Sequence, residues 1–319
     1  MPAPAQPQDM YGGGWGPKKI AVFTKNLLNP AYAAARLGAD RIAAQFGAVA
    51  VHYVPRKPDD IDEQCALIRR AIDEGADAIA LSAVHPTRIN AAVAEINAAG
   101  LPLSGFISRT TEGAWDCFAG SDDVELGATL AQYLFTHMGG KGDVVVIEAS
   151  ADSSTSVDRA RGFRATAEKF PGIRIVGRCY GTYQYEPARA AMATLLETTP
   201  HVDAVLAAND VMALGAIDAL RAVNRSAVVV GINAIPEAIT AVKSGALLAT
   251  ANSNAMNLAA LAVEALLRRL RGEAVPPQIM LPTTIVDAGN ANDFDLPFEQ
   301  RPCLNWAAAT AATTNSPKR

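Results

Sequence analysis

The stretch that decides the fold is VLAANDVMALGAIDAL, residues 205–220. An apolar run is followed by an Asn-Asp pair and then by apolar residues at helical spacing, which predicts a buried strand leading directly into an amphipathic helix. The polar pair, Asn209 and Asp210, stands where the chain leaves the core. We assign a structural role to Asp210, because an Asp at the start of a helix accepts hydrogen bonds from free backbone NH groups. Asn209 then offers both a donor and an acceptor to a ligand.

The same order of strand and helix recurs along most of the chain. Apolar runs separated by helical patterns indicate parallel sheets that are covered on both faces by helices. Two of these units repeat at an offset of roughly 125 residues: KKIAVFT at residue 18 corresponds to GDVVVIEA at residue 142, and GADAIALSA at residue 75 to HVDAVLAAN at residue 201. This repeat predicts two similar α/β lobes, with a ligand cleft at the carboxyl ends of their strands. The predicted strands cover residues 19–24, 49–54, 78–82, 101–106, 144–148, 173–180, 204–208 and 228–232.

The composition indicates a globular protein with no broad charged surface. The 319 residues are 50% apolar and 19% charged, and their formal net charge is -4. We therefore expect no partner among nucleic acids or anionic membranes. Residues 1–17 are rich in Pro and Gly and lack the long apolar core of a secretory signal, so they predict a flexible arm. Such an arm fits either the start of a mature exported protein or a cytosolic N-terminus.

No arrangement of residues predicts catalysis, a metal or a cofactor. The four His residues stand on separate elements, no nucleophile or phosphate-binding motif is present, and the Asp-rich stretch 287–295 lacks the spacing of a calcium loop. The four Cys residues form no metal-binding motif, and the pair Cys117 and Cys303 is a candidate for a disulfide that spacing alone does not establish. An enzyme is the less favoured class, because the strand ends offer mostly amides, hydroxyls and arginines.

Six motifs together resemble one known family. They are NPAY at 29–32, ISR at 107–109, DRARGF at 158–163, ANDVMALGA at 208–216, VGINAIPEA at 230–238 and GALLATANSNAMNLA at 245–259. From about residue 18 to residue 286, the chain is similar to the type I periplasmic solute-binding proteins of sugar ABC transporters, in particular to those of the ribose-binding type. Lactose-repressor-type regulators share this core, so a ligand-sensing module of a regulator or receptor is the alternative function.

The resemblance implies two Rossmann-like lobes with parallel sheets, joined by three crossovers near Ser121, Ser253 and Leu281. It places residues 18–121 and 254–281 in the N-terminal lobe, residues 122–253 in the C-terminal lobe, and residues 282–319 in the last crossover and a C-terminal extension. The implied function is to capture a monosaccharide, polyol or sugar derivative by hinge closure and to deliver it to a membrane permease. The resemblance further implies a periplasmic monomer whose signal peptide has been removed, with no cofactor and no nucleic acid partner.

The resemblance also implies a ligand-binding site. Planar amides and guanidinium groups suit vicinal hydroxyls, and an aromatic face suits the apolar side of a sugar ring. The implied ligand-binding residues are Asn29, Tyr32, Ser108, Arg109, Arg159, Tyr183, Asn209, Asn233 and Ser253.

Departures from the ribose-binding pattern leave the charge of the ligand open. Ribose binders carry Asp where this chain has Ser108 and Asn233, and a stacking Phe where it has Ala31, so ribose itself is not expected. With two carboxylates fewer, Arg109 and Arg159 favour an acidic sugar derivative, because an arginine pairs with a carboxylate through two parallel hydrogen bonds. A neutral sugar is expected if nearby carboxylates balance these arginines; the candidates are Asp152, Asp158 and Glu237.

Overall fold

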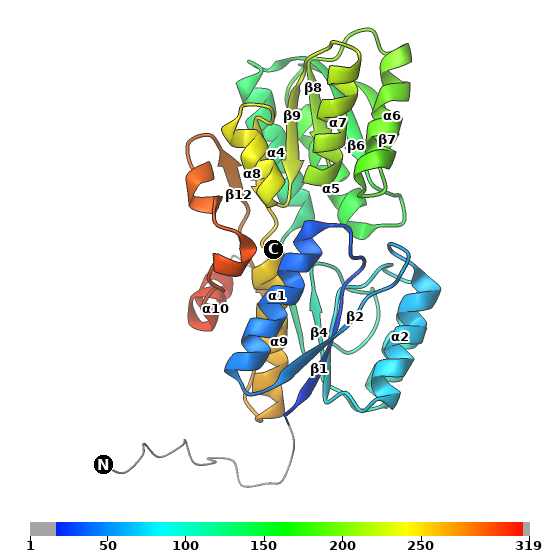
Figure 1. The fold of residues 1–319 in the computed structure, drawn as a ribbon, viewed down its shortest axis with the longest axis vertical. Coiled ribbons are helices and arrows are strands. Elements are labelled where there is room, and N and C mark those ends of the chain that lie inside the picture. Colours follow the sequence, from blue (N-terminus) through cyan, green and yellow to red (C-terminus); the bar gives the residue numbers. More distant parts are fainter. Residues whose placement is uncertain (1–16, 315–319) are drawn as a thin grey trace, which may run out of the picture.

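The computed structural model describes residues 17–314 and shows two α/β lobes, each built on a six-stranded sheet (Figure 1). The predicted flexible arm, residues 1–17, lies outside the described residues apart from Pro17. In the first sheet the strand order is β11-β5-β4-β3-β1-β2, and all neighbouring strands are parallel. Its strands are β1 (Lys19–Phe23), β2 (Val49–Tyr53), β3 (Ala78–Leu81), β4 (Leu103–Phe106), β5 (Cys117–Gly120) and β11 (Gln278–Met280). The helices of this lobe are α1 (Pro30–Gln45), α2 (Ile61–Asp73), α3 (Asn90–Ala98) and α9 (Ala255–Leu270).

The second sheet repeats this arrangement in the order β12-β10-β9-β8-β6-β7. Its edge strand β12 is antiparallel to β10, and the other pairs are parallel. Its strands are β6 (Lys141–Glu148), β7 (Gly172–Tyr180), β8 (Ala204–Ala207), β9 (Val228–Ile232), β10 (Ala249–Asn252) and β12 (Thr284–Asp287). The helices are α4 (Asp123–His137), α5 (Ser154–Ala167), α6 (Tyr185–Thr198), α7 (Asp210–Ala222) and α8 (Pro236–Lys243). The predicted pair of similar α/β lobes is therefore confirmed.

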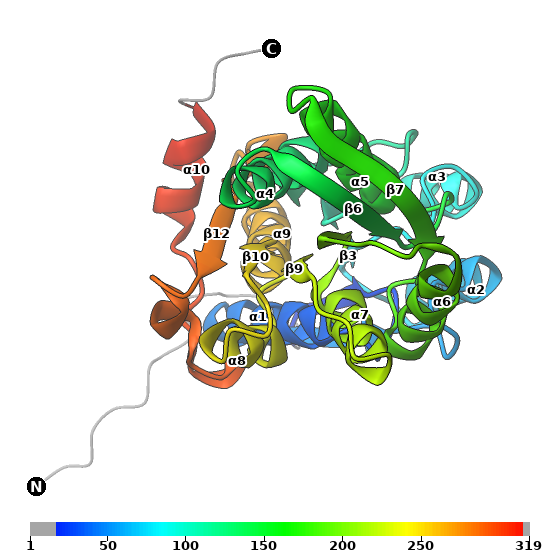
Figure 2. The ribbon, with the colours of Figure 1, turned by 90° about the horizontal axis from the view of Figure 1, so that it is seen from above.

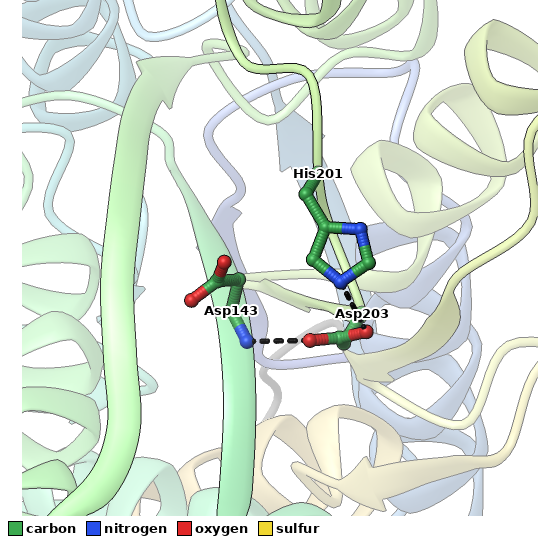
Figure 3. A group of neighbouring side chains, drawn as sticks. All are labelled: Asp143, His201 and Asp203. Carbon is green, nitrogen blue, oxygen red and sulfur yellow. Dashed lines mark hydrogen bonds and ion pairs between the residues drawn. The ribbon is translucent and has the colours of Figure 1, made fainter.

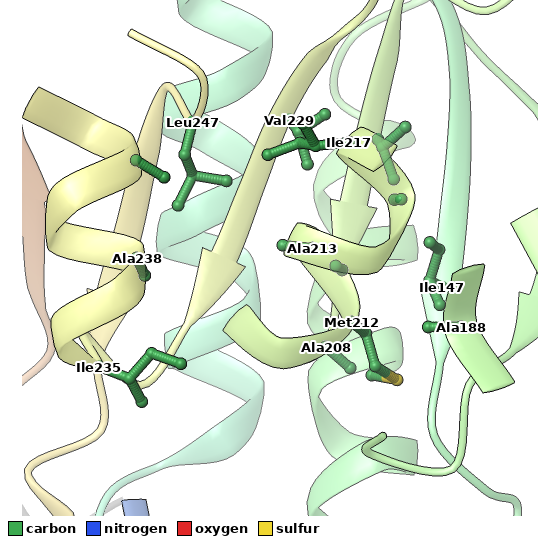
Figure 4. Close-up of a cluster of buried hydrophobic side chains, with 14 of the residues drawn as sticks. Ile147, Ala188, Ala208, Met212, Ala213, Ile217, Val229, Ile235, Ala238 and Leu247 are labelled. Atoms are coloured by element: carbon green, nitrogen blue, oxygen red, sulfur yellow. The ribbon is translucent and has the colours of Figure 1, made fainter. Parts of the chain in front are cut away.

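Each sheet is apolar on both faces, and each face carries its own hydrophobic cluster. On one face of the second sheet, Met212 and Ile217 of α7 pack with Val229 of β9 and with Leu247 (Figure 4). A different cluster, which includes Leu130 of α4, fills the opposite face of the same sheet. The first sheet likewise has one cluster on each side. These paired cores are what parallel strands covered by helices require.

All eight predicted strands are present, and four short strands were not predicted. The four are β5, β10, β11 and β12, and none is longer than four residues. Sequences such as ATAN in β10 and QIM in β11 are too short to show a period of apolar residues. They become strands because a neighbouring strand supplies their hydrogen-bond partners, which is a tertiary effect.

The chain passes between the lobes at three crossovers, after β5, after β10 and after β11, as the resemblance implied. It then continues past β12 through two short 3-10 helices, η1 (Ala291–Phe294) and η2 (Phe298–Gln300), to α10 (Trp306–Thr314), which packs on the first lobe. The candidate disulfide is not formed, because Cys117 in the first core and Cys303 at its edge are both free thiols. Within residues 17–314, no helix has both the length and the apolar character needed to cross a membrane.

Candidate ligand-binding site

A pocket lies between the two lobes at the carboxyl ends of their strands, and it is lined by residues of both. Six of the nine predicted residues meet in it: Asn29, Tyr32, Arg159, Tyr183, Asn233 and Ser253. The remaining lining residues are Ala31, Ile107, Thr155 and Ala255. The cavity between these side chains is about 30 Å³, which holds a water molecule but no sugar ring. The lobes are thus closed on one another, and a solute can enter only if they separate or their side chains move.

Arg159 is the charged centre of this pocket. It lies on α5 with only 5% of its surface exposed, and its Nε donates to Asp123 Oδ1 at 2.7 Å while Nη1 donates to the Ala208 carbonyl at 2.7 Å. Burial is the largest single effect on Arg159 and opposes its charge, but the combined attraction of Asp123, Tyr183 and Tyr32 outweighs burial and raises the pKa of the guanidinium. Burial raises the pKa of the Asp123 carboxyl, and attraction to Arg159 opposes this effect, so the pocket holds one buried pair of opposite charges.

The carboxylate beside Arg159 is not one of the three predicted from the sequence. Asp158 pairs instead with Arg161 at 3.0 Å, and Asp152 and Glu237 are exposed. Asp123 is the first residue of α4, which follows the first crossover, and it meets Arg159 because α4 packs along α5. The sequence carried a weak signal for it, since Asp122 and Asp123 follow a strand end in the same way as the residues that were chosen.

The two tyrosines bring hydroxyl groups and aromatic faces from opposite lobes. The Tyr183 hydroxyl lies 2.7 Å from Thr155 Oγ1, whereas Tyr32 on α1 lies beside Ser82 of the first lobe. Burial raises the pKa of both phenols, so both remain neutral hydrogen-bonding groups at ordinary pH. Three lining residues, Ile107, Tyr183 and Asn233, have positive φ values of 64°, 57° and 132°. Such backbone strain costs on the order of 1 to 3 kcal/mol a residue and gathers at binding sites.

The asparagines of the site expose donors more than acceptors. The Oδ1 atoms of Asn29 and Asn209 accept backbone NH groups at the starts of α1 and α7, at 3.0 and 2.9 Å. Asn233 Oδ1 accepts the Ser253 hydroxyl at 3.0 Å. Asn209 Nδ2 is buried and has no hydrogen-bond partner among the described residues. The side-chain carbonyl groups are thus engaged within the protein, which leaves the amide NH groups of Asn29 and Asn233, the two that line the pocket, for ligand oxygens.

The roles of Asn209 and Asp210 differ from the prediction. Asn209, which was predicted to bind the ligand, does not line the pocket and is instead the N-cap of α7. Asp210 is the first residue of α7. The buried Asp210 carboxylate accepts the Thr250 hydroxyl at 2.6 Å and the Ile235 NH at 3.1 Å, and so joins α7 to β10 and α8. Burial raises the pKa of Asp210 to about 7. The prediction that Asp210 caps the helix was wrong because the cap lies one residue earlier.

Two predicted residues, Ser108 and Arg109, do not reach the pocket. The Ser108 hydroxyl donates to the Ala83 carbonyl at 2.9 Å, within the first lobe. Arg109 is exposed, and its guanidinium carbon lies 4.6 Å from the ring centre of Phe118. Both residues line an outer groove beside the first crossover. Arg109 therefore adds no charge to the central pocket.

Lys25 is a buried group near the pocket that the prediction did not include. It follows β1 with 3% of its surface exposed, and its ammonium has no hydrogen bond or ion pair among residues 17–314. Burial lowers the pKa of Lys25, and attraction to Asp59 and then to Asp123 opposes this effect. Burial also raises the pKa of Asp59, so burial favours the uncharged form of both groups, and their mutual attraction opposes it.

One cluster elsewhere resembles a metal site by composition. Asp143, His201 and Asp203 lie at the amino ends of β6 and β8, at the far end of the second sheet from the pocket (Figure 3). Asp203 accepts the Asp143 backbone NH at 2.7 Å and pairs with His201 at 3.0 Å, while both Asp143 oxygens accept Arg174 at 2.6 and 2.8 Å. The carboxylate oxygens of Asp143 and Asp203 thus already have hydrogen-bond partners within the protein. We therefore assign a structural role to the cluster, which links β6 to the start of β8.

The chain belongs to the periplasmic binding protein domain family, whose model matches residues 20–274. It is therefore a two-lobed solute-binding protein, and the resemblance seen in its motifs is confirmed. The xylitol-binding protein of Mycolicibacterium smegmatis is 29% identical over 198 residues, which are 61% of this chain and 57% of that protein. The ribose import binding protein RbsB of Bacillus subtilis is 25% identical over 82% of this chain and 85% of its own.

Solved structures agree with this assignment. An ABC transporter solute-binding protein of Bacillus halodurans with bound myo-inositol superimposes with a TM-score of 0.82 at 26% identity, covering 89% of this chain and 99% of that one. A solute-binding protein of Mycobacterium smegmatis with bound glycerol gives a TM-score of 0.81 at 28% identity, with 87% and 96% covered. Both neighbours are covered almost completely, whereas more than a tenth of the present chain has no counterpart in them.

Proposed function

We propose that this protein captures a neutral monosaccharide or polyol between its lobes and delivers it to an ABC permease. The observation that carries the proposal is the charge balance of the pocket. Arg159 is already paired with Asp123, Lys25 lies near Asp59, and Arg109 stands outside the pocket. A carboxylate ligand would compete with Asp123 for Arg159 and leave a buried charge without a partner, which is costly. A neutral ligand needs no such exchange.

The donors and rings of the pocket match the chemistry of a polyol. Amide NH groups, the tyrosine hydroxyls and the Thr155 hydroxyl suit several hydroxyl groups, and the rings of Tyr32 and Tyr183 suit an apolar CH face. The names of the relatives support the same class: they include proteins that bind xylitol, import ribose and import D-apiose. The two structural neighbours hold myo-inositol and glycerol.

The remaining features of the proposal follow from this role. The chain would work as a monomer outside the cytoplasmic membrane, as a binding protein rather than an enzyme. Residues 18–121 with 254–281 and residues 122–253 would move as the two lobes about the crossovers. Closure would place the donors that line the pocket, such as Arg159 and the amide groups of Asn29 and Asn233, against ligand oxygens. Because each buried polar group without a partner costs about 1 to 3 kcal/mol, the pocket would reject a ligand that lacks a matching hydroxyl.

A calorimetric panel of matched ligands tests the charge and class of the solute. Xylitol, D-ribose, D-apiose and myo-inositol are titrated beside xylonate and D-ribonate, which add a carboxylate to similar carbon chains. We expect binding only within the neutral set. A bound ligand at a hundred times its Kd should also stabilise the fold by about 2.7 kcal/mol in a thermal unfolding experiment. Binding of the acids alone would contradict the neutral pocket, and a folded protein that binds neither set would contradict the ligand class.

A further inference from the structure

The C-terminal strap, residues 288–314, connects the two lobes for a fourth time. It leaves β12 in the second lobe, where η1 packs on α8 and Asp295 pairs with Lys243 at 2.6 Å. It ends in the first lobe, where α10 packs on β11 and Ala309 is buried in the cluster of α1 and α9. Figure 1 shows this path from the upper to the lower lobe, and Figure 2 shows α10 and β12 along the same side of the molecule. The matched family model ends before the strap, at residue 274.

Two arginines fasten the middle of the strap to opposite lobes. Arg41 on α1 of the first lobe donates to the carbonyl groups of Phe298, Glu299 and Arg301. Arg301 in turn donates to the Leu296 carbonyl within the strap at 2.7 Å and to the Ala234 carbonyl of the second lobe at 3.4 Å. A continuous series of contacts therefore runs from α1 through the strap to the segment between β9 and α8. If the lobes separate, either these contacts break or the strap deforms.

The second-lobe end of this series adjoins the ligand pocket. Ala234 directly follows Asn233, and both have positive φ values, 52° and 132°. Asn233 also lines a second cavity, which lies between the ligand pocket and the strap and is bounded on the strap side by Phe294, Leu296, Phe298 and Arg301. Ala31 and Ala255 line both cavities as well. The strap thus forms an outer wall behind the ligand pocket.

We infer that the C-terminal strap limits the separation of the lobes, and that Arg301 is a positioning residue that holds Asn233 in the pocket through the Ala234 carbonyl. A link that is intact only in the closed arrangement raises the population of that arrangement, and the apparent affinity rises by the same factor. The limit on lobe separation is independent of which solute binds. The role of Arg301 in affinity rests on the proposed function, because it requires that Asn233 faces the solute.

Small-angle X-ray scattering of the ligand-free full chain tests the limit on lobe separation. The variants are Arg41→Ala and Arg301→Ala, with Arg69→Ala as the matched control, because Arg69 is exposed and pairs with Glu95 on α3 within the first lobe. We expect a larger radius of gyration for R41A and R301A than for the wild type and R69A. Circular dichroism establishes that each variant is folded. Folded R41A and R301A chains with the wild-type radius would overturn the inference.

Calorimetry with xylitol and myo-inositol as probes tests the positioning role. We expect R301A to raise the Kd for a bound probe about tenfold and R301K, which keeps the charge on a single donor nitrogen, to raise it less, whereas R69A stays within twofold. An R301A variant that expands but binds as tightly as the wild type would remove the positioning role and leave the limit on opening. If neither probe binds the wild type, the choice of solute has failed, and the scattering result still decides on the strap.

Discussion

At the scale of single residues, the partner of a side chain decides what it can do. Arg159 and Arg109 were both predicted to bind the ligand, yet Arg159 is buried against Asp123 and Arg109 lies on Phe118 at the surface. We expect Arg159→Ala to weaken solute binding at least 100-fold, about 3 kcal/mol, because it removes a charged donor and leaves Asp123 buried without a partner. Arg109→Ala should change the affinity less than threefold. Isothermal titration of both variants measures the contrast, and equal effects would contradict the site.

The stability of the Arg159→Ala variant needs its own control. The unpaired Asp123 should lower the free energy of unfolding by a few kcal/mol, so a loss of binding could reflect a loss of structure. The double variant Arg159→Met, Asp123→Asn removes both charges and should recover most of this stability. It should not recover solute binding. If the double variant recovers both stability and solute binding, Arg159 contributes to binding only by stabilising the folded protein.

Asp210 predicts a pH dependence of stability whose sign follows from burial. Its pKa is about 7 in the folded protein, against an ordinary value of 3.8. Between these values the folded state keeps a proton that the unfolded chain has released, so the contribution of Asp210 to stability is present below pH 4 and is lost as the pH rises to 7. The loss is at most about 4 kcal/mol, since a tenfold change in proton affinity is about 1.4 kcal/mol. Urea unfolding of the wild type and Asp210→Asn from pH 4 to 7.5 measures the difference, and a constant difference would refute this effect.

At the scale of elements, the contact between α4 and α5 brings Asp123 to Arg159. The two helices touch backbone to backbone: a Cβ on Gly162 would lie 2.2 Å from the Val124 carbonyl, and a Cβ on Gly127 would lie 2.3 Å from the Arg159 carbonyl. Neither position has room for a side chain. The short distance between the helices is therefore set by glycine, and the ion pair of the pocket depends on it.

We expect Gly162→Ala to push α4 and α5 apart. The overpacking should lower the free energy of unfolding by about 1 to 3 kcal/mol and weaken solute binding through the displaced Arg159. Gly272→Ala is the control, since its φ is +79° and nothing lies within 4 Å of the added Cβ. It should cost about 1 kcal/mol and leave binding unchanged. Urea unfolding of both variants measures the change in stability, and calorimetric titration measures the change in solute affinity. A Gly162→Ala variant that binds the solute normally would show that the affinity does not depend on the contact between α4 and α5.

At the scale of the whole molecule, the closed pocket makes lobe motion a condition of binding. A cavity of about 30 Å³ cannot admit a monosaccharide or a polyol, although six predicted residues already converge on it. Ligand-free protein should therefore include more open arrangements, and a bound solute should shift them toward the closed one. Small-angle scattering should show a smaller radius of gyration at saturating solute. An unchanged radius, with binding confirmed by calorimetry, would mean that only side chains move.

The sequence by itself determined the alternation of strands and helices, the repeat of two lobes and most of the pocket. These features depend on local patterns: apolar runs such as residues 204–208 make buried strands, and polar residues such as Asn29 and Asn233 stand at strand ends that a parallel sheet gathers at one edge. Motif resemblance then distinguished Tyr32, Arg159 and Tyr183 from other polar residues. No tertiary information was needed for either step.

Only the tertiary structure decided which partner each polar group takes. Asp123 and Arg159 are separated by 36 residues and meet because two helices pack through glycines, while Arg109 turns away onto Phe118. The return of residues 288–314 to the first lobe likewise depends on surfaces that exist only after both lobes have formed. The physical reason is that the burial of a polar group and the identity of its partner depend on elements that are distant in sequence. A local sequence pattern therefore does not predict them.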